Sequence, residues 1–480
     1  MDNAILNDFG FGAFGSASSG FNTGQAEALV KALEVGDSAN PGDMGTGGNT
    51  LQFESLEAQL VSALNENVQD FKLMKLQPKK NVGSTVHQYT QETDSGEYDA
   101  IATSELGDPI ESSSDFARIT RNIKYFQTKR EASLQANLLN PIVGSAKAEA
   151  VEERLGTHVL LKGTEYLCFH GNESVSTNQP NGYPQMIRNE APDNVLDMSG
   201  TRITDSESTF EEAIRTVYEQ GGEISDAFFP PILAQDWQDL LKDRYRYNEG
   251  SKTAGSKLTT YQSMYGNDIF ISGRAGIDKM YKVKTVPTAS TNANAPSAPT
   301  FALVAQSLSG DGTGFDADTA GTYRYTVYAV DAEGRVSAAA TAANVAVASG
   351  EEAQVTITRG DAVNGAYATG YIVCRGKKDV TTGDDIREMY RVAASGSADT
   401  VTLDTNDELP GTAEILLLSS NQVQDTYQWD SFCDLKRFNL GATRASIPFL
   451  LVWYGTPDLK IAKRNALIKN VGHSGVSDWF

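Results

Sequence analysis

The sequence predicts an α+β protein into which a separate all-β sandwich is inserted. Three observations lead to this expectation: one long amphipathic helical stretch, two extended alternating stretches before it, and a series of short alternating stretches in the second half of the chain. With 480 residues, the chain exceeds one ordinary hydrophobic core, so two or three domains are expected.

The longest predicted helix runs from Ser145 to Gly171. Apolar side chains recur along it at steps of three, four or seven residues, which places them on one face. This predicted inner face comprises Val151, Leu155, Val159, Tyr166 and Phe169. The charged residues fall largely on the other side, namely Glu149, Glu152, Glu153, Arg154, Lys162 and Glu165. Gly156 and Gly163 each weaken such a helix by about 1 kcal/mol relative to alanine.

Residues 1–70 read as an N-terminal arm. The first 50 residues are rich in Gly, Ser, Asn and Asp and bury little on their own, so we expect them to be mobile or to fold against a partner. One short helix is predicted over Ala26–Leu33. A second amphipathic helix is marked by Phe53, Leu56, Leu60 and Leu64.

Residues 71–131 are predicted to form an extended β-hairpin. Thr85–Thr90 alternates, Phe116–Arg130 is a long strand-like run, and the segment between them is polar and acidic. Because an isolated hairpin is marginal in water, we expect it to lie on another subunit. Basic residues gather on it: Lys72, Lys75, Lys79, Lys80, Arg118, Arg121 and Lys124. The four lysines at its start are candidates for salt-sensitive ion pairs with an acidic neighbouring subunit, and a plain solvated base of the hairpin is an alternative of at least equal weight.

A compact α/β region is expected over residues 205–286. A capping box, Ser208–Glu211, opens a helix whose inner face is Phe210, Ile214, Val217 and Tyr218. A strand over Ile224–Phe229 and a helix starting at Pro231 follow. A strand pair within Tyr261–Tyr281 is predicted to turn at Gly266–Asn267.

Residues 287–415 change in composition. A Pro/Ala/Ser/Asn linker at 287–300 precedes six or seven short alternating strands, which is typical of a β-sandwich of the immunoglobulin or fibronectin kind. No Cys…Trp…Cys pattern accompanies them. The unbroken apolar run Ile447–Tyr454 predicts a buried strand in the last part, 416–480, so the sandwich is expected to be an insertion.

Composition excludes several classes of function. The formal net charge of −22 argues against wrapping nucleic acid on a basic surface, but not against enclosing DNA. The three cysteines are far apart, and the sequence offers neither a secretory signal nor 18 consecutive apolar residues, so we expect a protein made in the cytoplasm without a membrane span.

No catalytic, cofactor or metal site is expected. The GxGxxG string at Gly10–Gly15 lacks the strand–turn–helix context of a dinucleotide site. Asp311, Asp316 and Asp318 do not have EF-hand spacing, and the four histidines are dispersed. We therefore expect a protein that is not an enzyme and that has no cofactor.

The order of these parts resembles the major capsid protein of tailed bacteriophages, with the HK-ninety-seven-type capsid fold. The segment AEAVEERLGTHVLLKGTEYLCFHGN resembles the spine helix of this family, and LVWYGTPDLKIAKRNALIKNVG resembles its C-terminal strand and helical tail. The resemblance implies an N-terminal arm (1–70), an extended-loop hairpin (71–131), a peripheral domain with the spine helix (132–204), an axial and peripheral region (205–286), an Ig-like insertion (287–415) and a return to the capsid core (416–480).

The resemblance also implies a function and partners. Copies of the chain would self-assemble as pentamers and hexamers into an icosahedral shell that encloses double-stranded DNA without sequence-specific binding. Portal, scaffold and decoration proteins are candidate partners, and the Ig-like domain is a candidate for contact with the host surface. Assembly would take place in the host cytoplasm, and the mature location would be the virion capsid. The candidates for inter-subunit contact are Phe53, Leu56, Leu60, Lys72, Lys75, Lys79, Lys80, Arg118, Arg121 and Lys124.

Two other functions are compatible with parts of the sequence. A phage tail or surface-adhesion protein with an Ig-like module would form rods or fibres and would be rich in β-structure, without a long central helix. A hydrolase with an accessory sandwich would need a polar constellation in a cleft, of which the sequence gives no sign.

Overall fold

The computed structural model describes most of the chain after the predicted arm. All described residues belong to one compact unit, Ala63–Leu139 with Lys147–Phe480. Apart from a few isolated positions, the described ranges are 72–94, 113–138, 148–205, 207–241, 260–263, 268–272, 286–309, 314–383, 386–396, 399–419, 427–442 and 444–474. Both predicted helices of the arm, with Phe53, Leu56 and Leu60, lie outside the described residues.

The described part is a mixed α/β structure in which strands from distant parts of the sequence share sheets. One four-stranded sheet contains, in order, β1 (Lys79–Asn81), β17 (Tyr427–Asn439), β18 (Ser446–Leu459) and β4 (Lys124–Ser133). The first strand is parallel to its neighbour, and the other two pairings are antiparallel. Residues near position 80 therefore lie beside residues near position 430.

A second sheet has six strands. Its strands, in order, are β5 (Val195–Asp197), β19 (Ala466–Val471), β16 (Ala413–Leu418), β6 (Asp226–Phe228), β8 (Asp268–Ser272) and β7 (Thr260–Gln262). The strand before the predicted sandwich (β8) and the strand after it (β16) both pair with β6. The chain thus leaves this sheet and returns to it.

Among the described residues, six α-helices and two short helical turns accompany these sheets. They are α3 (Lys72–Leu76), α4 (Leu134–Leu138), α5 (Ala148–His170), α6 (Tyr183–Glu190), α7 (Glu207–Glu219), α8 (Pro231–Leu241) and the short turn η5 (Ala462–Arg464), with a further turn η3 at Pro192–Asn194. The predicted helix from Pro231 and the strand within Ile224–Phe229 are confirmed. The predicted capping box is wrong, because α7 already begins at Glu207 and Glu211 accepts hydrogen bonds from Tyr261 and Ser263 instead.

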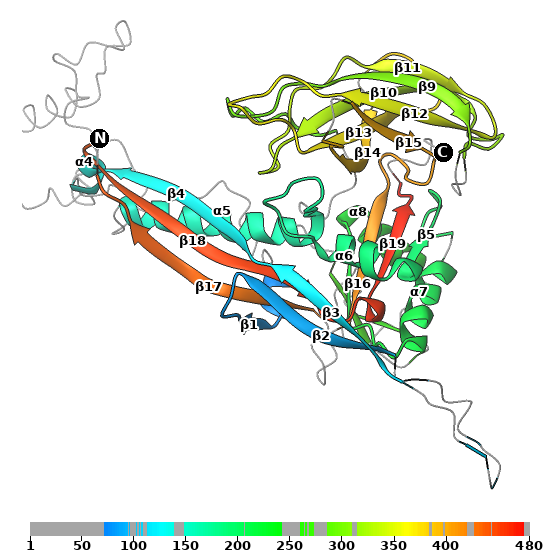
Figure 1. The fold of residues 1–480 in the computed structure, drawn as a ribbon, viewed down its shortest axis with the longest axis horizontal. Helices are drawn as coiled ribbons and strands as arrows, with labels where there is room; N and C mark the ends of the chain where they lie inside the picture. Colours follow the sequence, from blue (N-terminus) through cyan, green and yellow to red (C-terminus); the bar gives the residue numbers. More distant parts are fainter. Residues whose placement is uncertain are drawn as a thin grey trace, which may run out of the picture. The chain divides into compact units, whose positions relative to one another are not determined.

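The long helix α5 confirms the predicted helical stretch, and it runs beside β4 and β18 (Figure 1). Its inner face differs from the predicted one. The buried residues are Gly156, Leu160, Thr164, Glu165, Cys168 and Phe169. Val159 and Tyr166, predicted to point inward, are 51% and 38% exposed. Gly156 faces the sheet, where its lack of a side chain permits close approach to Leu451 of β18 and Arg130 of β4.

Glu165 was predicted to lie on the outer face, yet it is buried. Its carboxylate accepts a hydrogen bond of 3.0 Å from the backbone N–H of Leu73, at the start of α3. On the other edge of the helix, Arg437 of β17 pairs with Glu149 and, at 2.6 Å, with Glu153. The helix is therefore attached to the sheet by ion pairs at its beginning and to α3 by a buried carboxylate near its end.

The two glycines of α5 are expected to respond differently to the same substitution. A Cβ on Gly156 would lie 2.8 Å from Cδ1 of Leu451 and 3.0 Å from Cγ of Arg130, whereas a Cβ on Gly163 meets nothing within 4 Å. We predict that Gly156→Val lowers the free energy of unfolding by about 1–3 kcal/mol through overpacking. Gly163→Val is the matched control and should change it by less than about 0.5 kcal/mol. Denaturant unfolding measures both; equal losses would contradict the close packing.

Two predictions about strands need correction. The run Phe116–Arg130 is not one strand, because the chain breaks at the buried residue Ile123, between β3 (Asp115–Asn122) and β4. The first part pairs with β2 (Val86–Asp94), and the second joins the four-stranded sheet. The predicted helical tail is also wrong: after the single turn η5, residues Ala466–Val471 form the buried strand β19.

Residues 300–404 form a two-layer β-sandwich. One sheet contains, in order, β15 (Asp399–Asp404), β12 (Glu351–Thr358) and β9 (Thr300–Ser307), and the other contains β11 (Ala343–Val347), β10 (Gly321–Val330), β13 (Gly370–Gly376) and β14 (Ile386–Ala393). Side chains of both sheets form one core, for example Tyr325 and Val327 against Val355 and Ile357. A second small cluster joins Val175, after α5, to Ile372 of the sandwich.

Candidate functional site: the hairpin and its anchor

The β2–β3 hairpin has a sheet of its own. Its strands pair with each other, from Val86 opposite Asn122 to Asp94 opposite Asp115, and with no further strand among the described residues. Side chains along both strands alternate between exposed and half-buried. Phe116, 64% exposed, is the most exposed of the large apolar residues described. The hairpin thus offers an apolar side chain that its own chain does not cover.

The base of the hairpin is held by Arg121. Its guanidinium donates to both carboxylate oxygens of Glu190 at 2.6 and 3.0 Å, and its Nε donates to Asp458 at 2.7 Å. The Tyr89 hydroxyl donates to the same Asp458 oxygen at 3.3 Å. Burial raises the pKa of Tyr89, and Asp458 adds to the increase, so this hydroxyl stays protonated. Hairpin, α6 and β18 are therefore joined through one guanidinium.

A second carboxylate lies beside this anchor. Asp430 on β17 is fully buried, accepts a hydrogen bond from Gln428 and lies 3.8 Å from the His87 ring. Lys460 pairs with Asp458 at 2.5 Å, and its ammonium lies 3.7 Å from the centre of the Tyr89 ring. Anchor groups therefore come from β2, β3, α6, β17, β18 and the segment after β18.

The predicted candidate residues differ in their surroundings. Arg121 and Lys124 have partners within the chain, since Lys124 donates to Glu173 and to the Thr177 carbonyl, each at 2.7 Å. Arg118, Lys79 and Lys80 are exposed. Lys72 and Lys75 lie on α3. The inter-subunit role of these residues stays a prediction.

Sequence reasoning did not find Glu190, Asp430, Asp458 and Lys460. Only pairing between strands brings them to the hairpin, because Asp430 and Asp458 are more than 300 residues after β3 in the sequence. The one local signal was two charged residues, Asp458 and Lys460, a few positions after the long apolar run Ile447–Tyr454.

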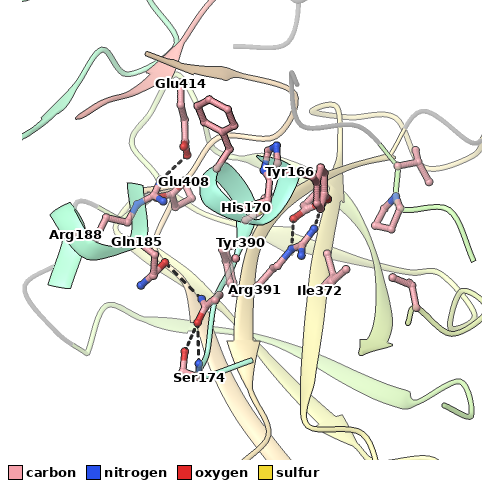
Figure 2. A pocket seen from close by; sticks show the side chains of 18 of the residues that line it. Tyr166, His170, Ser174, Gln185, Arg188, Ile372, Tyr390, Arg391, Glu408 and Glu414 are labelled. Atoms are coloured by element: carbon pink, nitrogen blue, oxygen red, sulfur yellow. Dashed lines mark hydrogen bonds and ion pairs between the residues drawn. The ribbon is translucent and has the colours of Figure 1, made fainter. Parts of the chain in front are cut away.

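A cavity of about 630 Å³ lies where α5 ends, lined also by α6 and β14 (Figure 2). Its two arginines are each paired with a carboxylate: Arg188 with Glu414, and Arg391 with Glu388 at 2.7 Å. Both arginines of the cavity are therefore already paired within the chain.

The described residues contain neither a metal-binding cluster nor a membrane-spanning helix. Among them, no group of three or more His, Cys, Asp and Glu side chains is placed to hold a metal ion. None of the helices in this part of the chain has the length and apolar character needed to cross a membrane.

The chain is similar in sequence to known phage proteins. Residues 41–274 match the family model described as SU10 major capsid protein. The putative major capsid protein of Enterococcus phage phiEF24C is 24% identical over 79% of this chain and 80% of its own length. The major capsid protein of Staphylococcus phage S25-3 is 22% identical over 94% of this chain and 96% of its own. A solved structure from Microbacterium phage Oxtober96 has a TM-score of 0.45 and 7% identity, covering 89% of this chain and 99% of that one.

The chain is therefore a structural protein of a phage capsid. Within that class it is a major capsid protein, the protein from which the virion shell is made.

Proposed function

We propose that copies of this protein assemble as pentamers and hexamers into a closed icosahedral shell that encloses double-stranded DNA. The observation that carries the proposal is the β2–β3 hairpin, which has a sheet of its own, is tied to its subunit at the base and exposes Phe116. Marginal hairpins gain stability by lying on another surface. A contact of this kind between unlike surfaces closes into rings, and rings tile into shells.

Further exposed apolar side chains support contacts between copies. They lie on α5 and β17 and are Val159, Tyr166, Phe432, Leu435 and Phe438. Many modest contacts of this kind suffice when each subunit repeats them. The net charge of −22 supports an inner wall that repels the phosphate backbone, so that DNA packs without adhering.

We further infer an HK-ninety-seven-type arrangement within the shell. In it, residues 1–70 reach over an adjacent subunit, the hairpin lies across a neighbour in the same ring, and α5 with the four-stranded sheet of β1, β17, β18 and β4 forms the continuous floor. Residues 205–286 point to the centre of the capsomer. Portal, scaffold and decoration proteins would be the partners of such a shell, assembled in the host cytoplasm.

The strand order of the sandwich supports its interpretation as an Ig-like insertion. In the naming of immunoglobulin strands, β11, β10, β13 and β14 take the positions C′, C, F and G, and β9 and β12 take B and E. The difference is β15, which lies beside E as strand D does, but follows G in the chain. As an outward-projecting module, the sandwich is a candidate for contact with the host surface.

The test of the shell proposal is Phe116→Ser. Because Phe116 is exposed, we expect an unchanged free energy of unfolding, within about 0.5 kcal/mol, and a clear loss of closed particles in electron micrographs and sedimentation. The matched control is Val304→Ser, 54% exposed on the sandwich, which should leave the floor and the particles intact. Full assembly of the Phe116 variant would contradict the hairpin's role, and rods or tubes from the unmodified protein would contradict the shell.

A further inference from the structure

Two buried carboxylates lie together where the hairpin meets the four-stranded sheet. Asp430 and Asp458 are both inaccessible to solvent and come from the neighbouring strands β17 and β18. The Lys460 ammonium is 2.5 Å from an Asp458 oxygen but 4.0 Å from the nearest Asp430 oxygen. Asp458 therefore has close cationic partners in Lys460 and Arg121, whereas Asp430 has none within 3.5 Å among the described residues.

Groups from every element packed around Asp430 face this pair. They are Lys80 of β1, His87 and Tyr89 of β2, Arg121 of β3, Tyr183 and Glu190 of α6, Gln428 of β17, Asp458 of β18 and Lys460. Of these, the groups of β2 and β3 belong to the hairpin, and the others belong to the body of the subunit. The cluster is thus the side-chain connection between the two.

Two short backbone segments connect the hairpin to the body of the subunit. On one side the chain passes from β1 to β2 through residues 82–85, and on the other it passes from β3 to β4 through the single residue Ile123. One hydrogen bond of 2.9 Å, from the Ile123 N–H to the Thr85 carbonyl, joins these two connections. The side-chain cluster is therefore well placed to set how firmly the hairpin is held against its own subunit.

We propose that this cluster is a proton-dependent latch. A proton taken up by the Asp430–Asp458 pair holds the hairpin against its own subunit, and loss of that proton loosens the hairpin. The proposal rests on the proposed function in one respect: the loosened hairpin is the form that is free to lie on a neighbour.

The direction of the pH dependence of the latch follows from the surroundings of each titratable group. Burial and then the neighbouring Asp458 raise the pKa of Asp430 to about 6, from an ordinary value of 3.8. The latched form therefore binds a proton that the loosened, hydrated form does not, so latching strengthens as the pH falls from 7.5 to 5. Burial opposes ionisation of Asp458, but Lys460 and Arg121 outweigh it and lower its pKa, so Asp458 stays charged in this range.

His87 acts in the opposite direction. Burial and the nearby Lys460 lower the pKa of His87 from 6.5, so protonation of this ring favours the loosened form as the pH falls. A test of the carboxylate pair must therefore remove His87. His87→Gln keeps a polar side chain beside Lys460 and no longer titrates.

The experiment is hydrogen exchange of the purified full-length subunit, followed in peptides from β2 and β3 and corrected for the intrinsic effect of pH. In His87→Gln, we expect the hairpin to open about tenfold less often at pH 5 than at pH 7.5. Adding Asp430→Asn, which mimics the protonated acid, should give the low opening level at both pH values. Asp430→Ser provides a second neutral side chain if the amide does not fit.

Two controls accompany the measurement. Peptides from β10 and β13 of the sandwich report whether each variant is folded, and Asp434→Asn, an exposed carboxylate on the same strand, should leave the pH dependence of His87→Gln unchanged. Absence of pH dependence in His87→Gln, or its persistence after Asp430→Asn, would overturn the latch. Because no shell is needed, failure of this test leaves the proposed function standing.

Discussion

Replacing Arg121 by alanine is expected to lower the free energy of unfolding by about 3–5 kcal/mol. The guanidinium is 12% exposed and joins Glu190 to the fully buried Asp458, so its removal leaves a buried carboxylate with Lys460 as its remaining close cation. We also expect the hairpin to lose protection from hydrogen exchange before the sheet strands do. Chemical denaturation and exchange measured on the same variant check both effects.

Arg118→Ala is the matched control. It removes the same type of side chain from the same strand, but Arg118 is exposed, so the free energy of unfolding should change by less than about 0.5 kcal/mol. If Arg118 is an inter-subunit residue, this variant is stable yet assembles poorly. Equal stability of the two arginine variants would contradict the anchor.

Replacing Asp404 by alanine is expected to destabilise the sandwich by about 3–5 kcal/mol. Asp404 accepts hydrogen bonds from Arg375 at 2.7 Å and from the Tyr325 hydroxyl at 2.6 Å, and Arg375 is 2% exposed. Removing the carboxylate leaves a buried guanidinium without its counter-ion. Calorimetry of the full chain should show the loss in a transition of the sandwich.

Asp361→Ala, an exposed carboxylate of the same sandwich, serves as the control and should change little. The double change Asp404→Leu with Arg375→Met should recover part of the loss, because apolar groups often replace a buried ion pair without cost. A loss shared equally by every transition in the chain would show that the sandwich does not melt as a separate part.

The sequence was sufficient for elements whose pattern is local. The helix α5, the hairpin and the buried strand β18 were all predicted, because helical periodicity, alternation and an unbroken apolar run each depend on near neighbours. The inner face of α5 was not predicted correctly. Large apolar residues such as Val159 suggested one face, but the sheet packs against Gly156, where the lack of a side chain permits close approach.

The anchor depends on contacts that no local pattern records. Arg121, Glu190 and Asp458 meet only because β18 pairs with β4 and the chain bends at Ile123. In an acidic chain, individual carboxylates carry no signal that sets Asp430 or Asp458 apart. Their burial, which gives them their chemistry, appears only once the strands are assembled.

The four-stranded sheet has a consequence for biosynthesis. β4 ends at Ser133, and its partner β18 begins at Ser446, so a ribosome must add about 300 residues between them. At about 5–20 residues per second, this takes about 15–60 s. Throughout that interval the side of α5 that packs against β18 lacks this covering strand, so we expect chaperones to protect the nascent polypeptide. We therefore expect copies on one polysome to join one another only when translation is nearly complete.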